Sequence, residues 1–141
     1  MSTPYPGLDA RRIIVADEDR QAVDFIIKTL REDGHAVFHA YDFLAAVQLA
    51  EFLPGCHLLI SNTKVEDSDG VGLISHLRQK HPALPIVYLA NTGRSTPERE
   101  ARLPSDVPFL REPFTREKLR AVTNRMLDGD GNRPPGGDFN G

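Results

Sequence analysis

Short, continuous apolar runs recur along the chain, and each is separated from the next by a longer segment with a different pattern. Runs of this kind are typical of parallel strands that are covered on both faces. Five of them are predicted to be strands: Ile13 to Ala16, Ala36 to Phe38, Leu58 to Ser61, Ile86 to Ala90 and Val107 to Leu110. The apolar pattern therefore predicts a buried sheet.

The segments between these runs carry apolar residues at helical spacing. One helix is predicted around Ala22 to Leu30 and stops before Gly34, a residue type that often follows a helix. Asp42 is the predicted N-cap of a helix from Phe43 to Leu53. Three further helices are predicted: one from Val71 to Leu77, one that begins near Pro97, and one that is capped by Thr115 and runs to Met126.

This alternation predicts the α/β fold class. Five strands alternating with five helices imply a parallel sheet with right-handed crossovers, and short connections favour an open, doubly wound sheet over a barrel. Such sheets bind their ligands beyond the carboxyl ends of the strands. We therefore expect the functional site among the residues at those ends: Asp17, Glu18, Asn62, Ala90 and Glu112.

The length of 141 residues fits one domain with an ordinary hydrophobic core. All the predicted elements fall within residues 11–127, so residues 1–10 are interpreted as an N-terminal extension. Residues 128–141 are rich in Gly, Asp, Asn and Pro, and we expect them to form a disordered tail.

Composition narrows the range of partners. The formal net charge is -3 and there is no basic run, which argues against a nucleic-acid partner. No apolar run approaches the roughly 18 residues of a membrane span, so a membrane role is not expected either. Cys56 is the only cysteine and the N-terminus lacks the basic-then-apolar pattern of a secretory signal, so we expect a cytoplasmic protein.

Four segments are informative because of their order and spacing: Ile13 to Asp19, Leu58 to Leu73 with Asp69-Gly70, Pro85 to Leu89, and Glu112 to Phe114. Together they resemble the receiver domains of response regulators in two-component signalling. The resemblance covers roughly residues 11–127 and implies the flavodoxin-like receiver fold, with a five-stranded parallel sheet and five helices.

The resemblance also assigns roles to the acidic residues after the first strand. Asp17 and Glu18 match the acids that hold a magnesium ion in the family, and two adjacent carboxylates suit this hard cation. Weak binding of Mg²⁺ at Asp17 and Glu18 is therefore expected. The alternative is that one of the two carboxylates only helps to cap the following helix.

Three positions depart from the pattern of the family. Asn62 stands where receivers have the acceptor aspartate, and a neutral carboxamide is not a useful nucleophile for acyl-phosphate chemistry. Ala90 replaces the switch Ser or Thr, and Glu112 replaces a lysine. The resemblance thus implies a degenerate receiver that has lost the usual phosphotransfer. The side chain of Glu112 has an alternative, which is to turn outward and pair with Arg111 or Lys64.

The remaining candidate residues have simple explanations. Phe109 matches the switch aromatic of the family, and it is equally well explained as a core aromatic. His35 and His39 lack a third ligand, which argues against a zinc site. The chain contains no Ser-His-Asp, Cys-His or glycine-rich phosphate motif, so we do not expect an enzyme.

We therefore interpret the chain as an atypical, single-domain response regulator, a pseudo-receiver that binds proteins without being phosphorylated. The expected partner is a histidine kinase or another signalling protein, which docks on the first helix or on the face of the fourth helix, fifth strand and fifth helix. The second face is also a candidate homodimer interface.

The alternative function is unorthodox phosphotransfer in a phosphorelay, with the phosphate on a residue other than the usual acceptor. The candidate acceptors are Asp17, Glu18, Asp67 and Asp69. A purely structural or oligomerisation role is the third interpretation.

Overall fold

A computed structural model describes residues 10–62, 72–91, 93–129 and 137–138 of the chain. Its strands are β1 (Arg12–Ala16), β2 (Ala36–Ala40), β3 (Leu58–Asn62), β4 (Ile86–Ala90), β5 (Pro108–Arg111) and β6 (Gly137–Asp138). Its helices are α1 (Arg20–Glu32), α2 (Phe43–Phe52), α4 (Leu73–Lys80), α5 (Pro97–Ala101) and α6 (Arg116–Asp128). The five predicted strands and five predicted helices are therefore confirmed.

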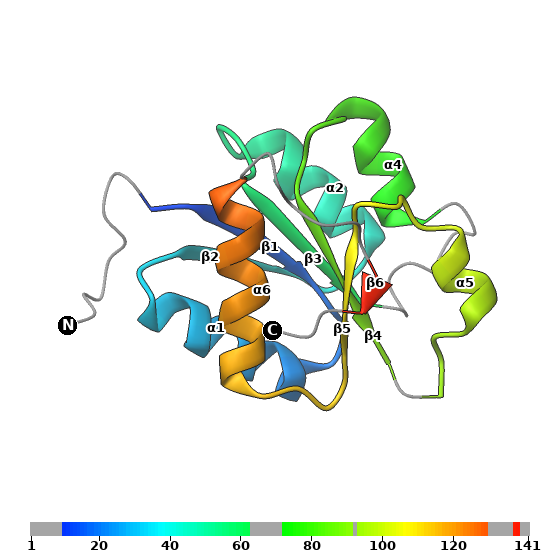
Figure 1. Ribbon diagram of the computed structural model, residues 1–141. Coiled ribbons are helices and arrows are strands. Elements are labelled where there is room, and N and C mark those ends of the chain that lie inside the picture. Colours follow the sequence, from blue (N-terminus) through cyan, green and yellow to red (C-terminus); the bar gives the residue numbers. More distant parts are fainter. Residues whose placement is uncertain (1–9, 63–71, 92, 130–136, 139–141) are drawn as a thin grey trace.

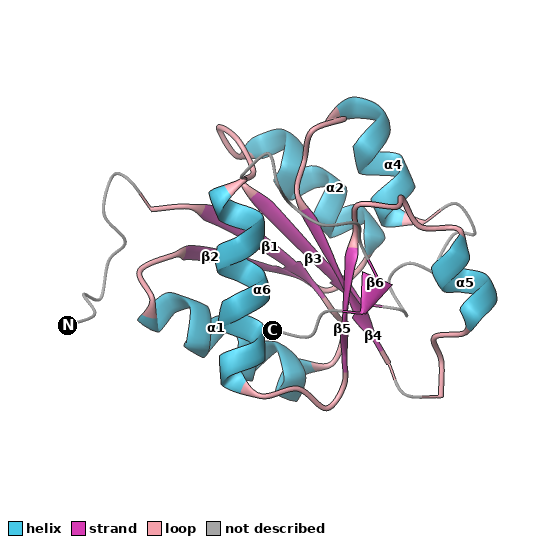
Figure 2. Ribbon diagram, in the orientation of Figure 1, coloured by secondary structure: helices cyan, strands magenta, loops and turns pink. Residues whose placement is uncertain are grey.

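The strands form one parallel sheet in the order β2-β1-β3-β4-β5-β6. Helices α1 and α6 cover one face of this sheet, and α2, α4 and α5 cover the other (Figures 1 and 2). This arrangement is the predicted open, doubly wound sheet. The carboxyl ends of the strands lie at the lower side of Figure 1, and that edge is where the sequence places the site.

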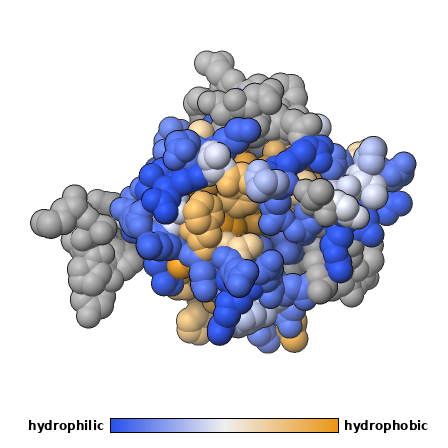
Figure 3. All heavy atoms as spheres, turned by 90° about the horizontal axis from the view of Figure 1, so that it is seen from below, coloured by the Kyte–Doolittle hydropathy of each residue, from blue (hydrophilic) through white to orange (hydrophobic). Residues whose placement is uncertain are grey.

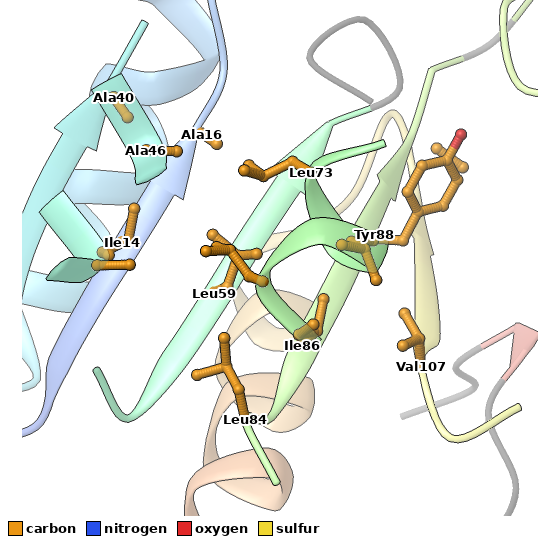
Figure 4. Packing of buried hydrophobic residues seen from close by; sticks show 14 residues of the cluster. Ile14, Ala16, Ala40, Ala46, Leu59, Leu73, Leu84, Ile86, Tyr88 and Val107 are labelled. Atoms are coloured by element: carbon orange, nitrogen blue, oxygen red, sulfur yellow. The ribbon is translucent and has the colours of Figure 1, made fainter. Parts of the chain in front are cut away.

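Each face of the sheet has its own hydrophobic core, because neighbouring residues of a strand point to opposite faces. Ile13 and Val15 of β1 pack with α1 and α6, whereas Ile14 and Ala16 pack with α2 and α4. Figure 4 shows the second of these cores, with Leu59 and Ile86 at its centre. Burial on both faces explains why the strands are continuous apolar runs in the sequence.

The predicted helix caps are also present. The side chain of Asp42 accepts a hydrogen bond from the N–H of Ala45 at the start of α2, and Thr115 accepts one from Lys118 at the start of α6. Gly34 follows α1 with a φ of +91°, a conformation that glycine adopts without strain. In the described part of the chain, no helix combines the length and apolar composition needed to cross a membrane.

The structure differs from the sequence prediction in the C-terminal tail. Residues 137 and 138 form strand β6 beside β5, with Gly137 opposite Pro108 and Asp138 opposite Phe109, where disorder was predicted. Two residues carry no apolar pattern, so backbone pairing at this position is invisible in the sequence. The rest of the predicted tail beyond Gly129 lies outside the described residues.

Candidate functional site

Asp17 and Asn62 meet at the carboxyl ends of the neighbouring strands β1 and β3. The amide Nδ2 of Asn62 donates a hydrogen bond to Oδ1 of Asp17 over 2.7 Å. The backbone N–H of Asp19 donates to the same oxygen over 2.8 Å. Asp17 is 1% exposed and Asn62 is 3% exposed, so this is a buried contact between a carboxylate and a neutral amide.

The environment of Asp17 disfavours its charge. Burial raises its pKa from the usual 3.8 to about 6, and the nearby carboxylates of Asp19 and Glu18 also raise it. The N–H of Asp19 and the imidazole of His39 act in the opposite direction. At neutral pH the carboxylate is ionised and is stabilised by two donated hydrogen bonds, one of them from Asn62.

We expect the raised pKa of Asp17 to make the free energy of unfolding depend on pH. Because the pKa of Asp17 is raised in the folded protein, the stability that protonated Asp17 contributes is fully present below pH 3.8. This stability is lost as the pH rises through about 6. The linkage alone corresponds to about 3 kcal/mol, and screening of these charges by solvent reduces the expected loss to about 1–2 kcal/mol. Urea unfolding of the wild type and of Asp17→Asn measures it, in buffer without divalent ions.

The wild type should lose stability relative to Asp17→Asn between about pH 4 and pH 7. Taking the difference removes the contributions of other acids, such as Glu100, whose pKa is lowered by its hydrogen bond to Arg111. A difference that stays constant over this range would contradict the raised pKa.

Glu112 and Ala90 complete this edge of the sheet. Ala90 ends β4 and is 2% exposed, and the backbone N–H of Glu112 donates to its carbonyl over 3.1 Å. The amide of Asn91 donates to Oε1 of Glu112. Burial raises the pKa of Glu112, and the charges of Asp17 and Asp19 raise it further. Glu112 therefore lies within the field of the acids that follow β1.

The described partner of Arg111 is Glu100, and the described partner of Glu112 is Asn91. Lys64, the other proposed partner, lies outside the described residues, as do Asp67 and Asp69. We refer to Asp17, Asn62, Ala90 and Glu112 as the carboxyl-edge site.

The described acids do not form a ready magnesium site. Oδ1 of Asp17 already accepts two hydrogen bonds, and Asp19 is the acid that caps α1, accepting from the N–H groups of Gln21 and Ala22. Within the described ranges, no group of three His, Cys, Asp or Glu side chains is placed to hold a metal ion. The donors therefore do not fit a tightly bound ion, and weak Mg²⁺ binding at Asp17 and Glu18 stays a prediction.

His39 has a different role from the one that a zinc site requires. Its Nε2 lies 2.7 Å from the backbone carbonyl of Asp17, and its imidazole packs on the ring of Tyr41 with centroids 4.2 Å apart. His39 thus ties the end of β2 to the end of β1.

Phe109 lies in β5 and is held by two contacts. Its ring packs edge-on against the buried Tyr88, with centroids 5.7 Å apart, and the guanidinium of Arg111 lies 5.9 Å from its centroid. Arg111 in turn donates two hydrogen bonds to Glu100 of α5, over 2.7 and 2.9 Å. Ser95 closes the set, because its hydroxyl accepts from Tyr88 and donates to Glu100.

We call Tyr88, Ser95, Glu100, Phe109 and Arg111 the Tyr88–Arg111 network. Sequence reasoning identified Phe109 alone, because the other four residues are joined by the fold and share no motif. The network connects β4, the loop after it, α5 and β5, and it contains no atom of the carboxyl-edge site.

Two phenylalanines lie between α1 and the start of α6. Phe25 is 37% exposed, its ring centroid lies 6.0 Å from that of Phe114, and the guanidinium of Arg116 lies 5.8 Å from its centroid. Figure 3 views the molecule from below relative to Figure 1 and shows an apolar area in the middle of this face, surrounded by hydrophilic residues. The side of the molecule at which the strands end therefore carries some exposed apolar surface.

Comparisons with known proteins agree with this fold. The family model of the response regulator receiver domain matches residues 13–124. The response regulator receiver protein CpdR of Brucella abortus is 24% identical over 83% of this chain and 97% of its own length. Response regulator MprA of Mycobacterium ulcerans is 31% identical over 82% of this chain, and this chain covers 50% of it.

The chain covers only part of several other relatives. It spans 12% of the sensor kinase CckA of Brucella abortus and 47% of the transcriptional regulatory protein YrkP of Bacillus subtilis. Among solved structures, a response regulator receiver protein from Sinorhizobium medicae superposes with a TM-score of 0.76 at 21% identity. That match covers 87% of this chain and 98% of the other.

Proposed function

The chain belongs to the response regulator receiver domain family, and from this we propose that it acts in two-component signal transduction as a receiver that binds a protein partner without being phosphorylated. The observation that carries the proposal is the contact of Asn62 with Asp17. Asn62 ends β3 with a neutral amide that donates to a carboxylate, and an acyl phosphate requires an Asp or Glu at the point of attack.

The other residues of the carboxyl-edge site support the same conclusion. Ala90 has no hydroxyl to donate to a phosphoryl oxygen. Glu112 contributes a carboxylate whose pKa is already raised by burial and by Asp17. At about 4 Å and an effective dielectric near 20, each pair of like unit charges costs roughly 4 kcal/mol. A dianionic phosphoryl group at this edge would therefore be repelled.

The Tyr88–Arg111 network supports a docking surface that has its binding conformation without phosphorylation. A ligand shifts a conformational equilibrium only through its different affinities for the two states. Here Phe109 is held by Tyr88 and by Arg111, and Arg111 is held by Glu100. These side-chain contacts involve no atom of the carboxyl-edge site, which supports an arrangement of α5 and β5 that is the same with and without a phosphoryl group.

The proposed partner is a histidine kinase or another signalling protein. The relatives include a sensor kinase and response regulators, and Phe25 of α1 offers a partly exposed ring beside Phe114. The face of α5, β5 and α6 is the second proposed docking surface. We also propose that the receiver domain spans residues 11–127.

We expect partner affinity to be the same with and without a small phosphodonor and magnesium. The measurement is a binding isotherm for the wild type with purified histidine kinases and response-regulator partners encoded in the same genome. Phe109→Ala should weaken binding at the face of α5, β5 and α6 by about tenfold or more, or about 1.4 kcal/mol. Tyr41→Ala is the matched control, because it removes an exposed aromatic ring near the opposite edge of the sheet.

A tenfold change in wild-type affinity on adding the phosphodonor would contradict the proposal and favour the unorthodox phosphotransfer alternative. Mass mapping would then be directed at Asp17, Glu18, Asp67 and Asp69. Phe109→Ala binding as tightly as the wild type would reject the face of α5, β5 and α6 as the docking surface.

A further inference from the structure

The outer edge of β5 is covered by the chain's own C-terminal segment. Strand β6 (Gly137–Asp138) continues the sheet beyond β5 in the parallel direction. Gly137 lies opposite Pro108, and Asp138 lies opposite Phe109. Figure 1 shows β6, in red, beside β5. The chain therefore comes back to the sheet after α6 and pairs with the first half of β5.

The covered edge lies at the centre of the face of α5, β5 and α6. Helix α6 packs on one side of the sheet and α5 on the other, and β5 runs between them (Figure 2). Phe109, whose replacement is expected to weaken docking at this face, is one of the two residues that β6 pairs with. A partner therefore cannot reach the backbone edge of β5 at Pro108 and Phe109 while β6 is paired there.

The pairing is of a kind that breaks readily. Strand β6 has two residues, whereas strands in globular proteins usually have at least three. Parallel pairs are slightly less stable per residue than antiparallel pairs. Pro108 has no N–H group, so one of the two paired positions of β5 offers no donor. Strand β6 is therefore held weakly by its backbone contacts.

The short connection to α6 compensates for this weakness. Seven residues separate Gly129, which follows α6, from Gly137. A short tether gives the two joined segments an effective concentration on the order of millimolar. A contact that is weak between separate molecules is therefore formed in most molecules when both segments belong to one chain. A partner that contacts a larger surface displaces it.

We propose that the pairing of β6 with β5 is an autoinhibitory contact, which a protein partner must displace to dock on the face of α5, β5 and α6. This inference rests on the proposed function, because that function assigns the face to a partner. The apparent dissociation constant of a partner is its intrinsic value divided by the fraction of molecules that are competent to bind. If β6 is paired in about nine-tenths of the molecules, docking is weakened about tenfold.

The test uses the full chain with Gly137→Pro and Asp138→Pro. Successive N–H groups of a strand point to opposite sides, so the double variant removes whichever N–H faces β5. Binding isotherms compare it with the wild type against those purified histidine kinases and response regulators whose binding Phe109→Ala weakens. The double variant should bind these partners about tenfold more tightly than the wild type does, or by about 1.4 kcal/mol.

The matched control is Asp130→Pro with Gly131→Pro. It replaces the same two residue types in the same C-terminal segment and makes the same change of charge, but it leaves β6 intact. It should bind these partners with wild-type affinity. Both double variants should keep the wild-type unfolding temperature, because the substitutions lie outside the two hydrophobic cores.

A synthetic peptide of residues 130–141 supplies a readout that needs no partner. It should shift the amide resonances of Phe109 and Leu110 in the Gly137→Pro, Asp138→Pro variant. The occupancy and the effective concentration given above correspond to a peptide Kd on the order of 0.1 mM. The wild type should bind the peptide about tenfold more weakly, because its own β6 already occupies the edge. Absence of a response in the double variant would overturn the contact itself.

The partner measurements separate this inference from the proposed function. If the Gly137→Pro, Asp138→Pro variant binds partners with wild-type affinity, the contact is not autoinhibitory, and the proposed function stands. Weaker binding by this variant would also overturn the inference, because β6 would then be part of the docking surface. Binding that is tighter in this variant but depends on a phosphodonor would contradict the proposed function and support the autoinhibitory contact.

Discussion

Replacing Asn62 with aspartate is expected to lower the free energy of unfolding by about 2–4 kcal/mol at neutral pH, the upper figure being one like-charge pair at about 4 Å and an effective dielectric near 20. The substitution exchanges the amide donor for a carboxylate beside Oδ1 of Asp17, in a site where both residues are almost fully buried. It removes one hydrogen bond to a charged group and adds a like charge. Sharing one proton between the two carboxyl groups limits the loss, as in other paired acids.

Urea unfolding at several pH values measures this loss. The added acid should have a raised pKa in the folded protein, so the destabilisation should shrink as the pH falls below the raised pKa. Asn124→Asp is the matched control, because it makes the same change at an exposed position of α6. Equal stabilities of the wild type and Asn62→Asp at neutral pH would show that the amide does not stabilise Asp17.

Phosphorylation by a small phosphodonor with magnesium is expected to be absent in the wild type, slight in Asn62→Asp, and near stoichiometric only in a triple variant. That variant combines Asn62→Asp with Ala90→Thr and Glu112→Lys. It supplies the nucleophile, the hydroxyl and the cation together, and it changes the formal charge of these three positions and Asp17 from -2 to -1. Ala90→Ser replaces Ala90→Thr if the larger side chain disturbs the buried end of β4.

Intact-mass spectrometry reads the extent of modification, and fragmentation places the phosphate. Lability to hydroxylamine identifies an acyl phosphate. The control is the double variant Ala90→Thr, Glu112→Lys, because it has the hydroxyl and the lysine but keeps Asn62 and so lacks the nucleophile. Full modification of Asn62→Asp alone would show that Ala90 and Glu112 oppose the reaction less than the electrostatic argument requires.

Much of the fold could be predicted because burial and local hydrogen bonding leave marks in the sequence. Each of β1, β3 and β4 is buried on both faces, so it is a continuous apolar run. The caps Asp42 and Thr115 act within three residues, so their residue types are sufficient. The meeting of Asp17 and Asn62 follows from parallel strands whose carboxyl ends share one edge.

The contacts that sequence reasoning missed are long-range or carry no pattern. Glu100 lies in a helix of five residues, and nothing local indicates that Arg111 of β5 binds it. The hydroxyl of Tyr88 donates to Ser95, and this contact depends on the path of the loop between β4 and α5. Asp19 caps α1, whereas the sequence pointed to Asp17 or Glu18. The exact end of a helix is difficult to place from sequence.

Strand β6 has a consequence for how copies of the chain meet in crowded solution. An open sheet edge offers unpaired N–H and C=O groups, which are a template for aggregation by strand addition. Gly137 and Asp138 occupy that template along Pro108 and Phe109, and Pro108 has no N–H to offer. Because β6 pairs with Pro108 and Phe109, the addition of a foreign strand at these two positions of β5 is blocked, and β2 forms the other edge of the sheet.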